Sequence, residues 1–149
     1  MTANLLVDSN VLVYAYDRSE PEKQLQALPV LARLADTGTG VLTTQVLSEF
    51  FNTVTRKIPT PLSATDAAER IYDFLIIWPV IEMTGTIILE AARGVHQHQL
   101  NFWDAQIWAA AKLSRVEVVL SEDFNVGAEL EGVRFVNPFA ADFDLDHFA

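Results

Sequence analysis

The chain of 149 residues contains no cysteine. Disulfide bonds and thiolate zinc sites are therefore excluded, and the composition fits a reducing compartment. Long apolar runs are also missing, because the longest, FLIIWPVI (74–81), includes Pro79 and is too short to span a bilayer. The start, MTANLLVDSN, has neither a basic end nor a long apolar core, which argues against a signal peptide. We expect a cytoplasmic protein that has no membrane partner.

Basic residues are scarce. The chain has 10 Lys and Arg against 20 Asp and Glu, a net charge of −10, and its longest basic run is Arg56-Lys57. Nucleic-acid-binding proteins usually present a basic face to the phosphates, so this composition is unusual for that class. Part of the negative charge could instead be a carboxylate cluster around a metal ion.

What is present is typical of one globular domain with strands and helices in alternation. Half of the residues are apolar and a fifth are charged. Apolar runs predict strands at 5–7, 41–42, 80–81, 116–120 and 133–136. Apolar periodicity and capping residues predict helices from 20 onward, at 43 or 44–57, 63 or 65–77, 84–96 and 101–113. This order favours a three-layer α/β/α sandwich with a mainly parallel central sheet.

Local sequence signals predict two details of the helix expected from residue 20 onward. Ser19 with Glu22 fits a capping box, and Pro21 suits the first turn. Pro29 should kink or divide the segment, because proline has no backbone N–H to donate.

The tail NPFAADFDLDHFA (137–149) alternates acidic with apolar residues and could be an extra element or an unpacked end. We assign 1–138 to the domain and 139–149 to the tail.

Four acids fall where a parallel sheet binds ligands, outside the carboxyl ends of its strands. Asp8 follows the first strand and Asp123 the fourth, while Glu49 lies in the second turn of one helix and Asp104 in the first turn of another. Each has a structural alternative. Asp8 could cap a helix together with Ser9 and Asn10, and Asp104 could serve only the helix dipole after an Asn101 cap. Glu49 could be a solvated helix residue and Asp123 a turn residue.

Such a cluster suits a hard cation, because Mg²⁺ and Mn²⁺ prefer oxygen ligands. Zinc is a poor fit. His96 and His98 would point to different faces of a helix, and neither they nor His147 belong to a zinc motif, so we expect ordinary surface residues. The sequence also lacks a Gly-rich phosphate loop and a G-x-S-x-G elbow.

Four segments carry a resemblance to a known family. LLVDSNVLVYA (5–15), TQVLSEFFNTV (44–54), LNFWDAQIWAAA (100–111) and VVLSEDFNVG (118–127) resemble, in this order and spacing, the acidic motifs of PIN-domain ribonucleases. The nearest group is the VapC-type toxins of bacterial toxin–antitoxin pairs, and the likeness runs to about Pro138. Ser9 stands where many members have threonine.

The resemblance implies a Mg²⁺- or Mn²⁺-dependent endoribonuclease that cleaves single-stranded RNA. Its catalytic and metal-binding acids would be Asp8, Glu49, Asp104 and Asp123, supported by Asn10 and Ser121. A cognate antitoxin is the implied protein partner. The apolar segments SEFFNTV and DFLIIWPVI exceed what a small core needs, so we also expect a homodimer.

Two other interpretations stay open. A phosphatase of the haloacid-dehalogenase type would need a second Asp two places after the first, where this chain has Asn10, and a Lys near LSEDFN. A catalytically inactive scaffold that binds RNA or protein could also retain an acid cluster.

Overall fold

A twisted, mainly parallel sheet forms the centre of the computed structural model, which describes residues 4–124 and 127–148. In those residues the sheet has six strands, in the order β3-β2-β1-β4-β6-β5. Only the edge pair β5–β6 is antiparallel. The strands are β1 (Leu5–Val7), β2 (Gly40–Thr43), β3 (Val80–Ile81), β4 (Val118–Leu120), β5 (Glu129–Leu130) and β6 (Val133–Val136).

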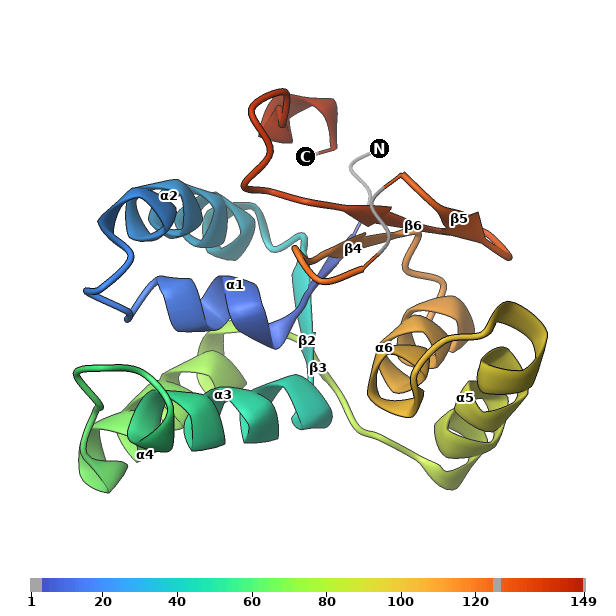
Figure 1. The fold of residues 1–149 in the computed structure, drawn as a ribbon, viewed down its shortest axis with the longest axis horizontal. Coiled ribbons are helices and arrows are strands. Elements are labelled where there is room, and N and C mark those ends of the chain that lie inside the picture. The colour runs from blue at the N-terminus through green and yellow to red at the C-terminus, as the bar shows by residue number, and fades with distance from the viewer. Residues whose placement is uncertain (1–3, 125–126, 149) are drawn as a thin grey trace.

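Helices cover both faces of the sheet. The helices are α1 (Ser9–Tyr14), α2 (Pro21–Thr37), α3 (Thr44–Arg56), α4 (Ala64–Ile77), α5 (Gly85–His98) and α6 (Phe102–Leu113). Helices α1 to α4 lie on one side of the sheet and α5 and α6 on the other (Figure 1). The expected three-layer α/β/α sandwich with a mainly parallel sheet is confirmed.

Most helix starts follow from the capping residues of the sequence. The side chains of Thr43, Ser63, Thr84 and Asn101 each accept a hydrogen bond from a backbone N–H of the first turn. The apolar stripe of α3 is buried as predicted, at Val46, Leu47, Phe50 and Val54. The predicted boundaries are therefore mostly close to the observed ones.

The predicted start of α2 is wrong in its detail. Glu20, not Ser19, is the N-cap, and its side chain makes no capping bond. The Ser19 hydroxyl lies outside the helix and donates to Asp17, 2.6 Å away. Pro21 does occupy the first turn. Pro29 does not divide the helix, which continues to Thr37. It lies on the exposed side, where water can satisfy the carbonyl group that its missing N–H leaves free.

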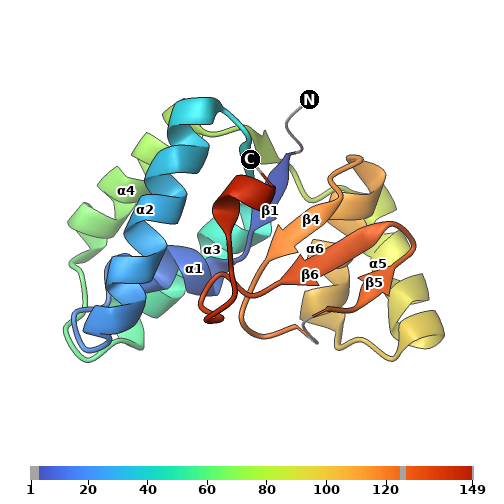
Figure 2. The ribbon, with the colours of Figure 1, turned by 90° about the horizontal axis from the view of Figure 1, so that it is seen from above.

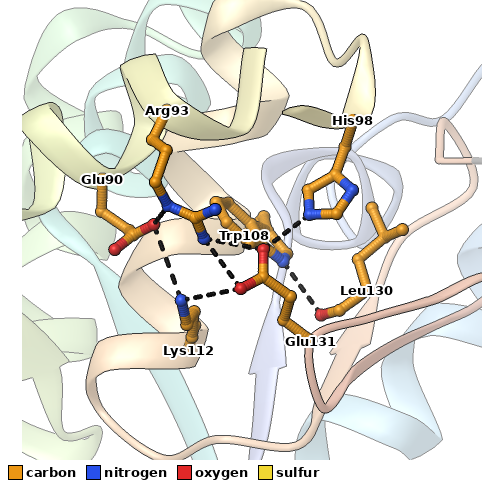
Figure 3. A network of polar contacts seen from close by, with 7 residues as sticks. All are labelled: Glu90, Arg93, His98, Trp108, Lys112, Leu130 and Glu131. Atoms are coloured by element: carbon orange, nitrogen blue, oxygen red, sulfur yellow. Dashed lines mark hydrogen bonds and ion pairs between the residues drawn. The ribbon is translucent and has the colours of Figure 1, made fainter. Parts of the chain in front are cut away.

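The β5–β6 hairpin, of which β5 was not predicted, is tied to the helices by Glu131. Arg93 donates to both carboxylate oxygens at 2.8 and 2.7 Å, and Lys112 lies 3.1 Å from one of them (Figure 3). His98 Nε2 lies 2.6 Å from the same carboxylate. His96 is exposed, but His98 is not an ordinary surface residue, because its ring also packs edge-on against Trp108.

The described part of the tail packs against the body. The Phe139 ring packs edge-on against Tyr14, with 5.0 Å between centroids, and Arg33 pairs with Asp146, which lies in a short 3-10 helix (Leu145–His147). Figure 2 shows this segment beside α2. Among the described residues, no helix is long and apolar enough to cross a membrane.

Candidate active site

The centre of the site follows from strand register. Strands β1 and β4 are parallel neighbours, and Val7 pairs with Leu120. The next residues, Asp8 and Ser121, therefore emerge side by side at the carboxyl edge of the sheet. The Ser121 hydroxyl donates to Asp8 Oδ2 at 2.7 Å, and the Ser9 N–H donates to Oδ1 at 2.7 Å.

Asp8 is both a helix cap and a buried acid. It is the N-cap of α1 and is only 5% exposed. Burial raises its pKa to about 6, and the charges of Glu49 and Asp104 act in the same direction. The bonds from Ser121 and Ser9 oppose this shift, because they stabilise the charged form. The helix-cap and site interpretations of Asp8 are thus compatible.

Asn10 connects the first strand to the loop after β4. Its amide nitrogen lies 3.0 Å from Asp123 Oδ2 and 3.1 Å from Ser121 Oγ, with a longer contact of 3.5 Å to Asp8. The Ser121 oxygen also accepts the Asp123 N–H at 3.1 Å. Asn10 Oδ1 is buried and has no hydrogen-bond partner among the described residues.

Glu49 reaches the site from the second turn of α3. The Ser9 hydroxyl donates to its Oε2 at 3.0 Å, and Gln45 Nε2 donates to Oε1 at 2.6 Å. Gln45 lies one turn earlier on the same face, the spacing at which helical side chains meet. It also donates to the backbone oxygen of Trp103 at 3.1 Å, which joins α3 to the start of α6.

Asp104 approaches from the first turn of α6. Asn101, the N-cap, accepts the Asp104 N–H at 2.9 Å and donates its amide to Oδ2 at 2.6 Å. Burial raises the pKa of Asp104, the Asn101 bond opposes the shift, and the charges of Asp123 and Glu49 raise the pKa further. Asp104 therefore belongs to a capped helix start and also interacts electrostatically with the other acids.

The donor chemistry fits a hard cation, because all four acids offer oxygens and repel one another. Within residues 4–124 and 127–148, however, no three His, Cys, Asp or Glu side chains form a group that could hold a metal ion. A preformed cage is therefore not present. Mg²⁺ commonly binds through one or two carboxylates, water and substrate phosphate, and so does not require such a cage.

Two adjoining pockets open beside the acids, and Glu49 lines one of them and Asp123 the other. One, of about 540 Å³, is lined by Gln45, Ser48, Glu49, Asn52, Thr53, Lys57 and Trp103. The other, of about 390 Å³, is lined by Ser9, Asn10, Val13, Tyr14, Asp17, Thr53, Lys57, Ile58, Glu122 and Asp123. Thr53 and Lys57 line both, so the pockets meet along α3.

Several residues in and around these pockets were not predicted from the sequence. Gln45 could have been found from its spacing of four to Glu49. Glu122 accepts hydrogen bonds from Tyr14 and, at 2.7 Å, from Lys23, which holds the loop after β4 against α1 and α2. No local signal predicts the bond between Lys23 and Glu122, which are 99 positions apart.

The sequence matches the profile of the PIN domain over residues 5–127, and this match includes all four acids. The chain belongs to the PIN-domain family. No curated protein sequence matches it. The recognition made from the four motifs is confirmed at the level of the family.

Solved structures similar to this PIN domain include the VapC20 toxin of Mycobacterium tuberculosis, described as cleaving the sarcin-ricin loop. The TM-score is 0.64 at 17% identity, over 88% of this chain and 99% of the toxin. A toxin–antitoxin complex from Klebsiella pneumoniae gives 0.61 at 20% identity, over 91% and 98%. VapBC2 of Rickettsia felis, bound to a promoter DNA fragment, gives 0.61 at 15%, over 89% and 97%. At these identities the likeness shows the fold.

Proposed function

We propose that this PIN domain is a metal-dependent endoribonuclease that cleaves single-stranded RNA, and that it is the toxin of a toxin–antitoxin pair. The catalytic and metal-binding carboxylates would be Asp8, Glu49, Asp104 and Asp123. The observation that carries the proposal is the buried Asp8 carboxylate at the carboxyl edge of a PIN-domain sheet, held by two short hydrogen bonds and facing other acids.

The residues of the chain have distinct tasks in this proposal. Ser121 and the Ser9 N–H fix the Asp8 carboxylate, and Asn10 keeps Asp123 beside it. When bound, Mg²⁺ or Mn²⁺ would neutralise phosphate charge and lower the pKa of a water molecule. Hydrolysis would add a water molecule across the bond between phosphorus and the 3′ oxygen. The products carry 5′-phosphate and 3′-hydroxyl ends.

A nuclease assay on total bacterial RNA, with Mg²⁺, Mn²⁺ or EDTA, tests this activity. We expect cleavage only with metal, and Asp8→Asn and Asp104→Asn should each nearly abolish it. The double variant should be little worse than either single one, because residues that act as a unit are not additive. Cleavage in EDTA, or products with 2′,3′-cyclic phosphate ends, would contradict the proposal.

Asn10 also bears on the phosphatase alternative. A haloacid-dehalogenase-type phosphatase needs a second carboxylate at this position, whereas the Asn10 amide donates to Asp123 and Ser121. Release of inorganic phosphate from a phosphomonoester, with intact RNA, would favour the phosphatase. Absence of both reactions with metal present would favour an inactive scaffold.

The proposed protein partners are a second copy of the chain and an antitoxin. Phe50 is buried in the core, but helix α4 exposes Tyr72, Leu75, Ile76 and Ile77. This face suits a homodimer, and a monomer at micromolar concentration in light scattering would contradict it. The acid pocket suits an antitoxin Arg or Lys, since a charge-assisted bond to carboxylate is strong. Failure of the product of the adjacent gene to inhibit the nuclease would contradict the antitoxin.

A further inference from the structure

Lys57 is the basic residue best placed to meet a phosphate near the acids. It lies at the C-cap of α3 and lines both pockets, whose other described lining residues include no Lys, Arg or His. Its ammonium group makes no hydrogen bond or ion pair within the described part of the chain. Most other Lys and Arg side chains are ion-paired, as Lys23 is with Glu122 and Arg93 with Glu131.

This position matters because the acids around it repel polyanions. The chain has a net charge of −10, and Glu49 and Asp123 lie in the two pockets that Lys57 joins. A phosphate that approaches the acids therefore needs a local cation. A lysine ammonium on a flexible stem can supply that charge.

Trp103 lies in the first of these pockets and offers a flat apolar surface. Its side chain is 65% exposed, although its backbone oxygen is held by Gln45, which also binds Glu49. Trp103 immediately precedes Asp104, so the exposed indole and one of the four acids share the first turn of α6. Indole rings in single-strand-binding grooves stack on bases of any sequence.

We propose that the two pockets form one groove for single-stranded RNA, in which a base stacks on Trp103 and a backbone phosphate binds Lys57. This inference rests on the proposed nuclease function and adds how the substrate is held. Glu49 and Asp123 would lie beneath the bound strand, on either side of the shared Lys57 and Thr53 wall. Specificity for unpaired RNA follows, because a base within a duplex cannot turn its face onto the indole.

Binding is measured by fluorescence anisotropy of a labelled single-stranded RNA of about 12 nucleotides, in an Asp8→Asn background that prevents cleavage. Lys57→Gln should weaken binding several-fold. It should also reduce the slope of log affinity against log salt by about 0.7, the value for one lost phosphate contact. Lys57→Arg should restore both quantities. Arg115→Gln removes the same charge from an exposed position before β4, at the opposite end of that strand, and should change neither.

The proposed base stacking on Trp103 is tested by separate variants with a matched control. Trp103→Ala should weaken binding by about tenfold or more, as expected for one lost base–aromatic stack, whereas Trp103→Phe should retain most of the affinity. Tyr72→Ala removes an aromatic ring that is also 65% exposed, on α4, and should have no effect. A duplex RNA of the same sequence should bind more weakly than the single strand and should not respond to Trp103→Ala.

The possible results distinguish the RNA-groove proposal from the nuclease proposal. If Lys57→Gln and Trp103→Ala bind RNA like their controls, or if the Asp8→Asn protein binds no RNA at low salt, the groove is wrong even where the wild type cleaves RNA. If the same two variants lose only antitoxin binding, the surface serves a protein partner and the groove is also wrong. If RNA binding responds as expected but the wild type cleaves nothing with metal, the groove stands and the nuclease proposal fails.

Discussion

The Ser121 hydroxyl donates to the Asp8 carboxylate at 2.7 Å although the two residues are 113 positions apart. The same oxygen accepts the Asn10 amide and the Asp123 N–H, both at 3.1 Å. Ser121 is fully buried, so no water competes for these bonds. One hydroxyl thereby fixes the relative positions of the first and fourth acids.

Replacing Ser121 by alanine should therefore destabilise the protein most where Asp8 is charged. A buried charged acceptor that loses its donor costs about 1–3 kcal/mol. We expect a loss of that size at pH 8 and a smaller loss at pH 5, where a protonated Asp8 needs fewer donors. The pKa of Asp8 should rise further, because Ser121 now lowers it. Urea unfolding at both pH values, with carboxyl NMR titration, measures these effects.

The control for this variant is Ser48→Ala. Ser48 is exposed on α3 and its hydroxyl donates to the Thr44 carbonyl oxygen within the helix. Its loss should stay within about 0.5 kcal/mol at either pH. Equal losses for Ser121→Ala at pH 5 and pH 8 would show that Ser121 does not stabilise the Asp8 charge.

Asp8→Asn should make the metal-free protein more stable at pH 8. The folded pKa of Asp8 is raised from 3.8 to about 6, so the folded state binds more protons than the unfolded state between these values. Stability therefore falls as pH rises from about 4 to about 6 and remains lower above that window. At 1.36 kcal/mol per pKa unit, the penalty at pH 8 is at most about 3 kcal/mol.

Urea unfolding in EDTA across this pH range tests that direction. The wild type should lose stability as pH rises, and Asp8→Asn should flatten the curve. Glu131 acts in a separate pH window, because hydrogen bonds from His98 and Arg93 lower its pKa to about 2, and its contribution is lost only as pH falls below about 4.5. Asp142→Asn, in the exposed tail, serves as the control. If Asp8→Asn were less stable than the wild type at pH 8, the Asp8 carboxylate of the wild type would be stabilised by its surroundings and not destabilised by burial.

Much of this fold could be predicted because its signals are local. Thr43, Ser63, Thr84 and Asn101 precede apolar helical patterns and all four cap the expected helices. The capping box at Ser19 failed because Glu20, not Ser19, is the N-cap of α2, and the Ser19 hydroxyl donates to the buried Asp17. The position of Asp17 depends on tertiary packing, which sequence spacing does not reveal. Strand β5 was missed because two residues, Glu129–Leu130, carry no alternation.

The site was predictable where the fold forces residues together. Asp8 and Ser121 follow neighbouring strands, so the general rule on strand ends locates them without further knowledge. The partners that orient the acids were harder to predict. Ser9 was expected only as a cap, yet its hydroxyl donates to Glu49 across 40 positions. Such bonds depend on the packing of α1 against α3, which the sequence does not express as a pattern.

Gly94→Ala tests the packing between α5 and α6. Alanine is usually better than glycine in a helix by about 1 kcal/mol. Here, however, an added Cβ would lie 2.5 Å from the buried Trp108 ring, which cannot move away within a filled core. We expect a net destabilisation of about 1–3 kcal/mol, typical of overpacking. Gly85→Ala, with open space at its Cβ, is the control for thermal melts. A Gly94→Ala protein more stable than the wild type would show that the helices separate easily.

Asp104→Asn distinguishes a shared acid site from a simple helix acid. If Asp104 served only the dipole of α6, the change would cost about 0.3–1 kcal/mol. Burial and the charges of Asp123 and Glu49 raise its pKa, however, so the charge is unfavourable in the metal-free protein. We therefore expect metal-free Asp104→Asn to be at least as stable as the wild type at pH 8.

Magnesium should reverse that order. A ligand that binds only the folded state stabilises it in proportion to affinity, by about 2.7 kcal/mol at 100 times its Kd. Mg²⁺ should therefore raise the melting temperature of the wild type more than that of Asp104→Asn. Asp66→Asn is the matched control, because Asp66 holds the same position after the Ser63 cap of α4 and is exposed. It should lose a few tenths of a kcal/mol and respond to Mg²⁺ like the wild type. If Asp104→Asn melts lower without metal and Mg²⁺ shifts neither protein, Asp104 is only a first-turn helix acid and the four carboxylates do not share a metal.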